Sequence, residues 1–140
     1  MTFRRHFTVR FRHCDPAGIV FYPRYFEMMN DVLEDFLAEL GAPFAAFGER
    51  DVGVPTVALE ATFARPSFLG DALTVEMTVA RLGESSFALA YTGSCAGEER
   101  FTAKSTLVYA SNHGKNAIHS LPLPEGLRTG MSRYLSGETS

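Results

Sequence analysis

The sequence predicts an α+β domain in which one long helix covers an antiparallel sheet of five strands. Helical periodicity occurs in one long segment, residues 23–40, which follows a short strand-like segment. Four segments of alternating hydrophobicity come after it, with breaks short enough for hairpins. The chain has 140 residues, 46% of them hydrophobic, enough to form a core without disulfides or metals. We expect one domain over residues 1–135 and a disordered tail at 136–140.

The first element is predicted as a strand at residues 7–11. Phe7, Val9 and Phe11 alternate there with Thr8 and arginines, which is the period of a half-buried strand. A turn follows in the run Cys-Asp-Pro-Ala-Gly at residues 14–18. Its proline lacks a backbone donor and its glycine tolerates a positive φ, so the strand cannot continue through this run.

The second element is an amphipathic helix that begins at Pro23, a residue favoured in the first helical turn. Acidic side chains separate apolar residues that recur at steps of three and four: Tyr25, Phe26, Met29, Val32, Leu33, Phe36, Leu37 and Leu40. The run Gly-Ala-Pro at residues 41–43 ends the helix. A helix of about 17 residues spans ~25 Å, which covers only one face of five strands.

The remaining elements are predicted as four strands centred on residues 57–63, 73–79, 87–91 and 101–109. A short helix is expected within residues 127–135. Because the single long helix leaves one sheet face or edge uncovered, and such surfaces favour association, we predict a homo-oligomer.

Composition narrows the class of partner. The formal net charge is -3, unlike the basic surplus of a general nucleic-acid binder. No apolar stretch approaches the ~20 residues needed to span a bilayer. The first residues carry arginines without a following apolar block, and the only cysteines, Cys14 and Cys95, are far apart. We therefore expect reduced thiols, a cytoplasmic protein, and neither nucleic acid nor membrane as a partner.

Asp15 is the candidate catalytic residue. It lies in the turn that leads to the start of the helix, where unpaired N–H groups carry a partial positive charge. Such donors can polarise a carbonyl oxygen while a carboxylate attacks the carbonyl carbon or activates water. An Asp-Pro-Ala-Gly run is equally typical of an ordinary turn, so the local pattern leaves both interpretations open.

The longer run Cys-Asp-Pro-Ala-Gly-Ile-Val-Phe-Tyr-Pro-Arg-Tyr-Phe, residues 14–26, resembles the signature of the 4-hydroxybenzoyl-CoA thioesterase family. In outline the resemblance extends over residues 7–124, because the order of elements is also that of the family. It implies a hotdog fold, in which the five-stranded antiparallel sheet wraps around the long helix. It also implies hydrolysis of an acyl- or aroyl-CoA thioester, such as 4-hydroxybenzoyl-CoA, to free acid and CoA. The resemblance further implies a homodimer or homotetramer with active sites at the subunit interfaces. It implies no cofactor, because CoA belongs to the substrate.

The resemblance also implies roles for individual residues. Asp15 stands at the position of the catalytic nucleophile or general base, and the backbone N–H of Tyr22 at that of the donor to the thioester carbonyl. Gly18, in the turn, and Pro23, at the helix start, are candidates for close approach to the substrate. Where the aryl-CoA branch carries basic residues for the CoA phosphates, this chain has Glu84. The candidates for phosphate contacts are therefore Arg65, Arg81, Lys104 and Lys115.

Other functions remain as alternatives. His13, Cys14 and Asp15 are consecutive and cannot all face one ion, so no metal site is predicted. A hotdog dehydratase or hydratase would use a His–acid pair, but no histidine lies at the start of the helix. The chain could also be a non-catalytic acyl-CoA-binding protein or a complex-assembly protein, since a turn would retain Asp15 without catalysis.

Overall fold

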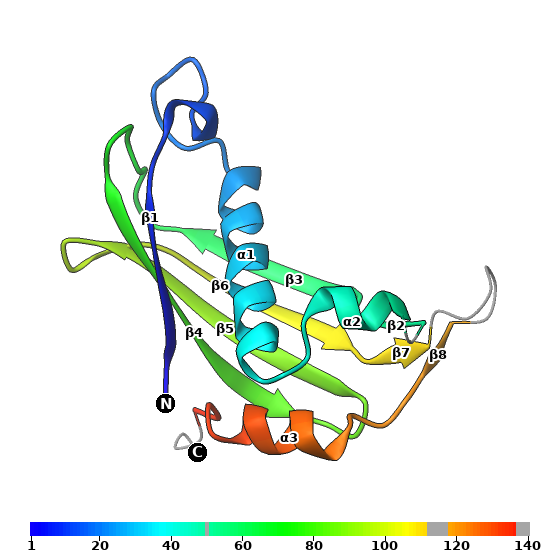
Figure 1. The fold of residues 1–140 in the computed structure, drawn as a ribbon. Helices are drawn as coiled ribbons and strands as arrows, with labels where there is room; N and C mark the ends of the chain where they lie inside the picture. The colour runs from blue at the N-terminus through cyan, green and yellow to red at the C-terminus, as the bar shows by residue number, and fades with distance from the viewer. Residues whose placement is uncertain (50, 112–117, 137–140) are drawn as a thin grey trace.

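The computed structural model describes residues 1–49, 51–111 and 118–136 (Figure 1). One antiparallel sheet of five strands, in the order β1-β4-β5-β6-β3, lies behind the long helix α1, Pro23–Glu39. The strands are β1 Phe3–Thr8, β3 Thr56–Phe63, β4 Ala72–Leu82, β5 Ser86–Cys95 and β6 Glu98–Val108. The predicted α+β class and the five-stranded antiparallel sheet are confirmed.

Short elements complete the fold. They are the 3₁₀ turn η1 Phe11–His13, the helices α2 Phe44–Glu49 and α3 Glu125–Ser132, and the two-residue strands β2 Val52–Gly53, β7 Ala110–Ser111 and β8 His119–Ser120. The three short strands form a second sheet in the order β2-β7-β8. The sequence did not predict α2 or this small sheet, because segments so short carry no periodicity. Within the described residues no helix is both long and apolar enough to cross a membrane.

The first strand lies earlier in the chain than predicted. β1 ends at Thr8, and residues 11–13 turn away from the sheet, which leaves Phe11 84% exposed. Two local hydrogen bonds close this turn: the N–H of His13 donates to the carbonyl of Arg10, and the N–H of Arg10 donates to Nδ1 of His13. The alternation at residues 7–11 could not distinguish this locally bonded turn from a continuing strand.

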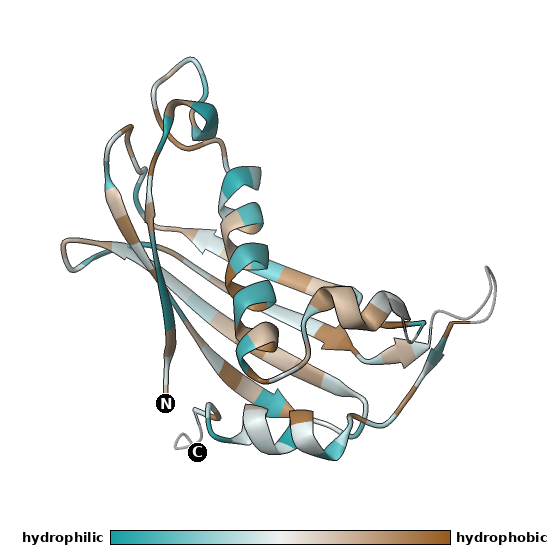
Figure 2. Cartoon of the chain, viewed as in Figure 1, coloured by the Kyte–Doolittle hydropathy of each residue, from teal (hydrophilic) through white to brown (hydrophobic). Residues whose placement is uncertain are grey.

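The hydrophobic core lies between α1 and the inner face of the sheet. Figure 2 shows the hydrophilic side of α1 turned outward and hydrophobic bands along the strands that the helix covers. The residues of this core with no exposed surface include Val32, Phe36 and Leu37 from α1, and Val75, Met77 and Leu89 from the strands beneath it. The face of the sheet away from α1 remains uncovered in the single chain, as the helix length predicted.

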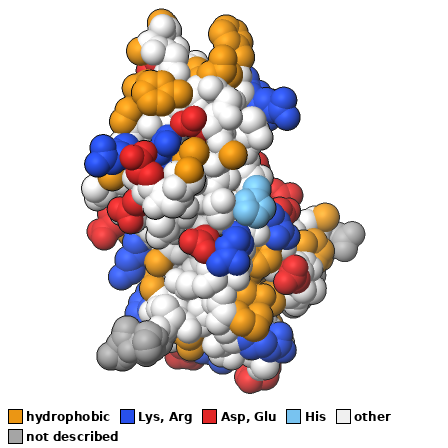
Figure 3. All heavy atoms as spheres, turned by 90° about the vertical axis from the view of Figure 1, so that its left-hand side faces the viewer, with side chains coloured by type: hydrophobic (Ala, Val, Ile, Leu, Met, Phe, Trp, Pro, Cys, Tyr) orange, Lys and Arg blue, Asp and Glu red, His pale blue; other side chains and the backbone are white. Residues whose placement is uncertain are grey.

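The two edges of the five-stranded sheet differ in charge. At the β1 edge, Arg4 pairs with Glu76 and Arg5 pairs with Asp35, and positive and negative side chains are closely mixed in the view of Figure 3. The eight residues of β3 contain one charged residue, Glu60. The large apolar side chains of β3 are exposed: Val57 60%, Leu59 45% and Phe63 45%. Charged side chains protect sheet edges from pairing, so β3 is the edge that is open to a further strand.

A glycine inside the sheet gives a test of the core. The ring of Phe101 in β6 lies over Gly93 in β5, so a Cβ atom at Gly93 would overlap the buried ring. Gly93→Ala is expected to lower the free energy of unfolding by about 1–3 kcal/mol, because the ring must shift in a closed core. Gly126→Ala in α3 is the matched control, since no atom lies within 4 Å of its added methyl group. Denaturant unfolding that shows equal stability for the two variants would contradict this packing.

Candidate active site

A cleft of about 510 Å³ lies where the turn after β1 meets the end of β3. Two segments far apart in the sequence form it, and three of the predicted site residues lie in its wall. Its lining consists of Asp15, Ile19, Val20, Phe21, Tyr22, Tyr25, Phe63, Ala64, Arg65 and Pro66. The fold therefore brings the candidate carboxylate, the helix start and one candidate phosphate contact into a single site.

The turn around Asp15 is held by its own hydrogen bonds. Oδ1 of Asp15 accepts the N–H of Ala17 at 2.8 Å, and the carbonyl of Asp15 accepts the N–H of Gly18 at 2.9 Å. Gly18 has φ +81°, a conformation that favours glycine. The other carboxylate oxygen, Oδ2, has no hydrogen-bond partner in the part of the chain that the structure describes. One oxygen thus fixes the orientation of the carboxylate, and the other is available for chemistry.

The N-terminus of α1 supplies a free donor to the same cleft. Tyr22 has φ −54° and ψ −33°, caps the helix without a side-chain hydrogen bond, and precedes Pro23, which has no N–H. The N–H groups of Val20 and Phe21 each donate to a backbone carbonyl at 2.9 Å. The N–H of Tyr22 donates to no acceptor among residues 1–49, 51–111 and 118–136. A carbonyl oxygen placed in the cleft could accept this hydrogen bond.

Aromatic rings form one wall of the cleft. The ring of Phe63 lies near three rings at the start of α1, with centroid distances of 6.1 Å to Tyr22, 5.8 Å to Tyr25 and 6.3 Å to Phe26. Such a surface suits a flat apolar group, which can stack on the rings. Tyr25 was predicted in the helix and Phe63 in a strand, but neither was predicted in the site. No local pattern signals their contribution, because the helix start and the strand end meet only in the folded chain.

His13, which precedes the turn that holds Asp15, is buried. Burial lowers the pKa of His13, and the positive charge of Arg12 lowers it further, so the imidazole is neutral at neutral pH. The backbone carbonyl of His13 accepts the N–H of Phe21 at 2.9 Å. Burial also raises the pKa of Tyr25, whose hydroxyl therefore stays protonated. No three His, Cys, Asp or Glu side chains are grouped as metal ligands among the residues that the structure describes.

Three other predicted site residues lie at the cleft or next to it. Gly18 and Pro23 flank the cleft without lining it. Arg65 lines the cleft with its guanidinium largely exposed, and its Nε lies 3.4 Å from Oε2 of Glu98. Of the candidate phosphate contacts among the described residues, it is the one that lines the same cleft as Asp15.

Two of the remaining basic candidates lie elsewhere in the chain. Arg81 is exposed in β4 and donates to the hydroxyl of Ser86 at 3.2 Å. Lys104 is exposed on the outer face of the sheet, in register with Glu60 of β3. Lys115 falls outside the described residues.

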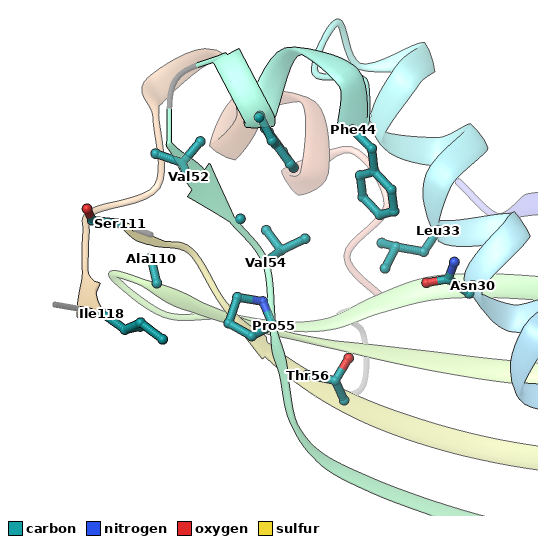
Figure 4. Close-up of a pocket in the computed structure, with 13 residues that line it drawn as sticks. Asn30, Leu33, Phe44, Val52, Val54, Pro55, Thr56, Ala110, Ser111 and Ile118 are labelled. Atoms are coloured by element: carbon teal, nitrogen blue, oxygen red, sulfur yellow. The ribbon is translucent and has the colours of Figure 1, made fainter. Parts of the chain in front are cut away.

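A second cavity, of about 480 Å³, lies farther along α1, beside the start of β3 (Figure 4). Figure 4 shows Asn30 and Leu33 on α1 facing the chain that runs from β2 into β3. Its lining is mostly apolar: Asn30, Leu33, Phe44, Phe47, Gly48, Val52, Gly53, Val54, Pro55, Thr56, Ala110, Ser111 and Ile118. This cavity was not predicted from the sequence, because α2 and β2 were not predicted.

Comparison with known proteins agrees with this architecture. The model of the thioesterase-like superfamily matches residues 9–130. The 1,4-dihydroxy-2-naphthoyl-CoA hydrolase of Acaryochloris marina is 30% identical over 129 residues, which cover 91% of this chain and 93% of that protein.

Solved structures of thioesterases are also similar to this chain. The gentisyl-coenzyme A thioesterase BH1999 is 30% identical, with a TM-score of 0.80 over 89% of this chain and 98% of its own. The 4-hydroxybenzoyl-CoA thioesterase from Pseudomonas sp. strain CBS-3 shares the fold, with a TM-score of 0.81 at 24% identity over 92% of this chain and 98% of that one. The resemblance found in residues 14–26 is thereby confirmed. The chain belongs to the thioesterase-like superfamily and is an acyl-CoA thioesterase with the hotdog fold.

Proposed function

We propose that this enzyme hydrolyses an aromatic acyl-CoA thioester, with Asp15 as the catalytic carboxylate and the N–H of Tyr22 as the donor to the thioester carbonyl. One observation carries the proposal: the free Oδ2 of Asp15 and the unbonded N–H of Tyr22 belong to residues that line the same cleft. A carbonyl group between them would have a donor at its oxygen and a carboxylate near its carbon.

Two routes use this arrangement. In the first, Oδ2 of Asp15 attacks the carbonyl carbon, the C–S bond breaks, and CoA leaves as a thiolate that solvent protonates. Water then hydrolyses the mixed anhydride, which releases the acid and restores the carboxylate. In the second, the carboxylate takes a proton from water as the water attacks the carbon, and passes that proton to the leaving thiolate. In both routes the N–H of Tyr22 stabilises the oxyanion, and one such donor is worth about 10²–10³ in rate.

The cleft favours an aromatic acyl group. The rings of Tyr22, Tyr25 and Phe63 offer an apolar aromatic wall in the same cleft that Asp15 lines. The relatives are named for 1,4-dihydroxy-2-naphthoyl-CoA, gentisyl-CoA and 4-hydroxybenzoyl-CoA, whose acyl groups are all aromatic. Arg65 is the proposed contact for a CoA phosphate at the mouth of the cleft.

We further propose a homodimer in which the β3 edges of two copies pair in antiparallel. Directly opposite residues then share a face, and Glu60 opposite Glu60 would place like charges together, which is unfavourable. Leu59 or Ala61 therefore lies nearest the two-fold axis. With Leu59 at the axis, the start of one β3 lies across from the end of the other, whereas with Ala61 at the axis Phe63 lies across from Leu59 of the second copy.

This pairing would join the two cavities across the interface. Phe63, at the end of β3, lines the catalytic cleft, and Thr56, at its start, lines the second cavity. The cleft of one copy would thus continue into the second cavity of the other, where Asn30 offers an amide to the acyl group. Two dimers that associate through the uncovered sheet face would form the tetramer. We also propose a cytoplasmic location, because both cysteines are free and the cytoplasm keeps thiols reduced.

The experiment that tests this function is thiol release from a panel of acyl-CoAs, followed with a thiol-reactive dye. We expect kcat/KM to be at least about tenfold higher for 1,4-dihydroxy-2-naphthoyl-, gentisyl- and 4-hydroxybenzoyl-CoA than for acetyl-CoA, because only the aromatic groups can stack in the cleft. Activity is expected to persist with a chelator and without added cofactor. A preference for aliphatic thioesters would contradict the substrate class, and tight CoA binding without hydrolysis of any thioester would support the non-catalytic acyl-CoA binder instead.

A further inference from the structure

Arg100 reaches from the start of β6 into the loop between β3 and β4. Its side chain is only 11% exposed. Nη1 of Arg100 donates to Oδ2 of Asp71 at 2.7 Å, to the carbonyl of Pro66 at 3.1 Å and to the hydroxyl of Ser67 at 3.3 Å. Its Nε lies 2.9 Å from a carboxylate oxygen of Glu98. One nearly buried cation therefore ties together three residues of this loop, in addition to the backbone hydrogen bonds that join the loop to Val9 and Val20.

Ser67 connects this loop to the catalytic cleft in two ways. Ser67 has no exposed surface, and its hydroxyl accepts a hydrogen bond from the hydroxyl of Tyr25, a wall residue, at 2.9 Å. Its carbonyl accepts the N–H of Val20 at 2.9 Å, within the segment between Asp15 and Tyr22. An isolated antiparallel bridge between residues 19 and 68 lies beside this bond. The loop held by Arg100 is thus the support against which the catalytic turn rests.

Asp71 is the charged partner of Arg100 in this loop. The same oxygen that accepts from Arg100 also accepts the N–H of Phe68 at 2.9 Å. The N–H of Phe68, and then the guanidinium of Arg100, lower the pKa of Asp71, so the carboxylate is ionised at neutral pH. A carboxylate that accepts two hydrogen bonds, one of them from a nearly buried guanidinium, is a strong and directional anchor.

We propose that Arg100 is a positioning residue for the thioesterase reaction, which acts through Ser67 and Val20 to hold the turn that carries Asp15. Arg100 is not among the residues that line the cleft. The inference rests on the proposed role of Asp15. Loss of Arg100 would leave the acceptors on Asp71, Pro66 and Ser67 without their shared donor, and the loop behind Val20 would shift. A displacement of about 1 Å between catalytic groups and substrate can cost on the order of 10² in rate.

The test compares Arg100→Gln with Arg100→Lys, and uses Arg4→Gln as the matched control, because Arg4 forms its ion pair at the distant β1 edge. For Arg100→Gln we expect kcat to fall by about 10- to 100-fold, with KM within about twofold of the wild type, since the wall that binds the acyl group remains. Arg100→Lys is expected to recover part of kcat, because an ammonium offers three donors to the same acceptors. Arg4→Gln is expected to keep the wild-type kcat.

Amide hydrogen exchange supplies a readout that general destabilisation would not reproduce. We expect Arg100→Gln to speed exchange at residues 15–22, above all at Val20, and to leave the middle of α1 unchanged. Ser67→Ala, which removes one hydroxyl with little change in volume, is expected to give the same pattern with a smaller fall in kcat, and serves if Arg100→Gln does not fold.

Three results decide the inference. Wild-type kcat in Arg100→Gln would overturn it, and so would faster exchange spread evenly over turn and helix, since Arg100 would then support only the fold. Loss of kcat with faster exchange confined to residues 15–22 would support it. Wild-type activity in Asp15→Asn is a separate failure, because it would remove the proposed catalytic carboxylate whatever Arg100 does.

Discussion

Replacing Asp15 with asparagine is expected to lower kcat on an aromatic acyl-CoA by about 10²–10⁴-fold, the usual contribution of a positioned acid–base group. Asparagine has nearly the same shape and keeps an oxygen that can accept the N–H of Ala17, so the turn is preserved. It lacks the negative charge and the free carboxylate oxygen that both routes require. Steady-state thiol release gives kcat. A midpoint temperature of thermal unfolding equal to that of the wild type would show that the fold is intact.

Asp31→Asn is the matched control for this variant. Asp31 lies on the exposed side of α1 and does not line the catalytic cleft, so its loss removes one negative charge without touching the site. Near wild-type activity in Asp15→Asn, or an equal loss in Asp31→Asn, would rule out Asp15 as the catalytic carboxylate. Mass spectrometry of wild-type enzyme quenched during turnover separates the two routes, because only nucleophilic attack leaves an acyl group on the peptide that contains Asp15.

Replacing Leu59 with lysine is expected to convert the proposed dimer into a monomer and to lower kcat by at least about tenfold. Leu59 lies on the exposed β3 edge and is 45% exposed in the single chain, so lysine is tolerated there before association. In the dimer it would put two positive charges near the two-fold axis and remove apolar contacts. The activity would fall because, in the proposed dimer, each cleft would lose the cavity that the second copy contributes. Light scattering should then give the 15.4 kDa mass of one chain.

Leu135→Lys is the control for the dimer prediction. Leu135 is 40% exposed, but it lies beside β4, away from the β3 edge. It should keep the oligomeric mass and the activity of the wild type. A wild-type protein that is monomeric and fully active at assay concentration would refute the shared site, and a fourfold mass would select the tetramer over the dimer.

The order of elements could be predicted because hydrophobic periodicity is a local property. The helix starts at Pro23 and spans the 17 residues expected, since its apolar positions repeat at the helical step and Gly41, with φ +87°, follows its end. β4, β5 and β6 were found from alternation in the same way. The first strand was misplaced at residues 7–11, because the hydrogen bond between Arg10 and His13 turns the chain within an apparently regular pattern.

The candidate site also contains some residues that the sequence could predict and others that it could not. Asp15 and Tyr22 are seven positions apart, joined by a turn that the local residues specify, so the sequence alone could propose a carboxylate beside a helix start. Phe63 and Arg65 come from the end of β3, and Arg100 from β6. No local pattern connects them with the turn, and the basic residues proposed for phosphate were not gathered in one place.

The sequence by itself determined the class of fold, the long helix and the turn that holds Asp15, because periodicity and turn chemistry act between residues that are neighbours in the chain. The tertiary structure decided which distant residues form the wall of the cleft, which loop supports the turn, and which sheet edge is left open. Those features depend on strand order and on contacts between β3, β6 and α1. Strand order follows from packing of the whole core, which no single segment encodes.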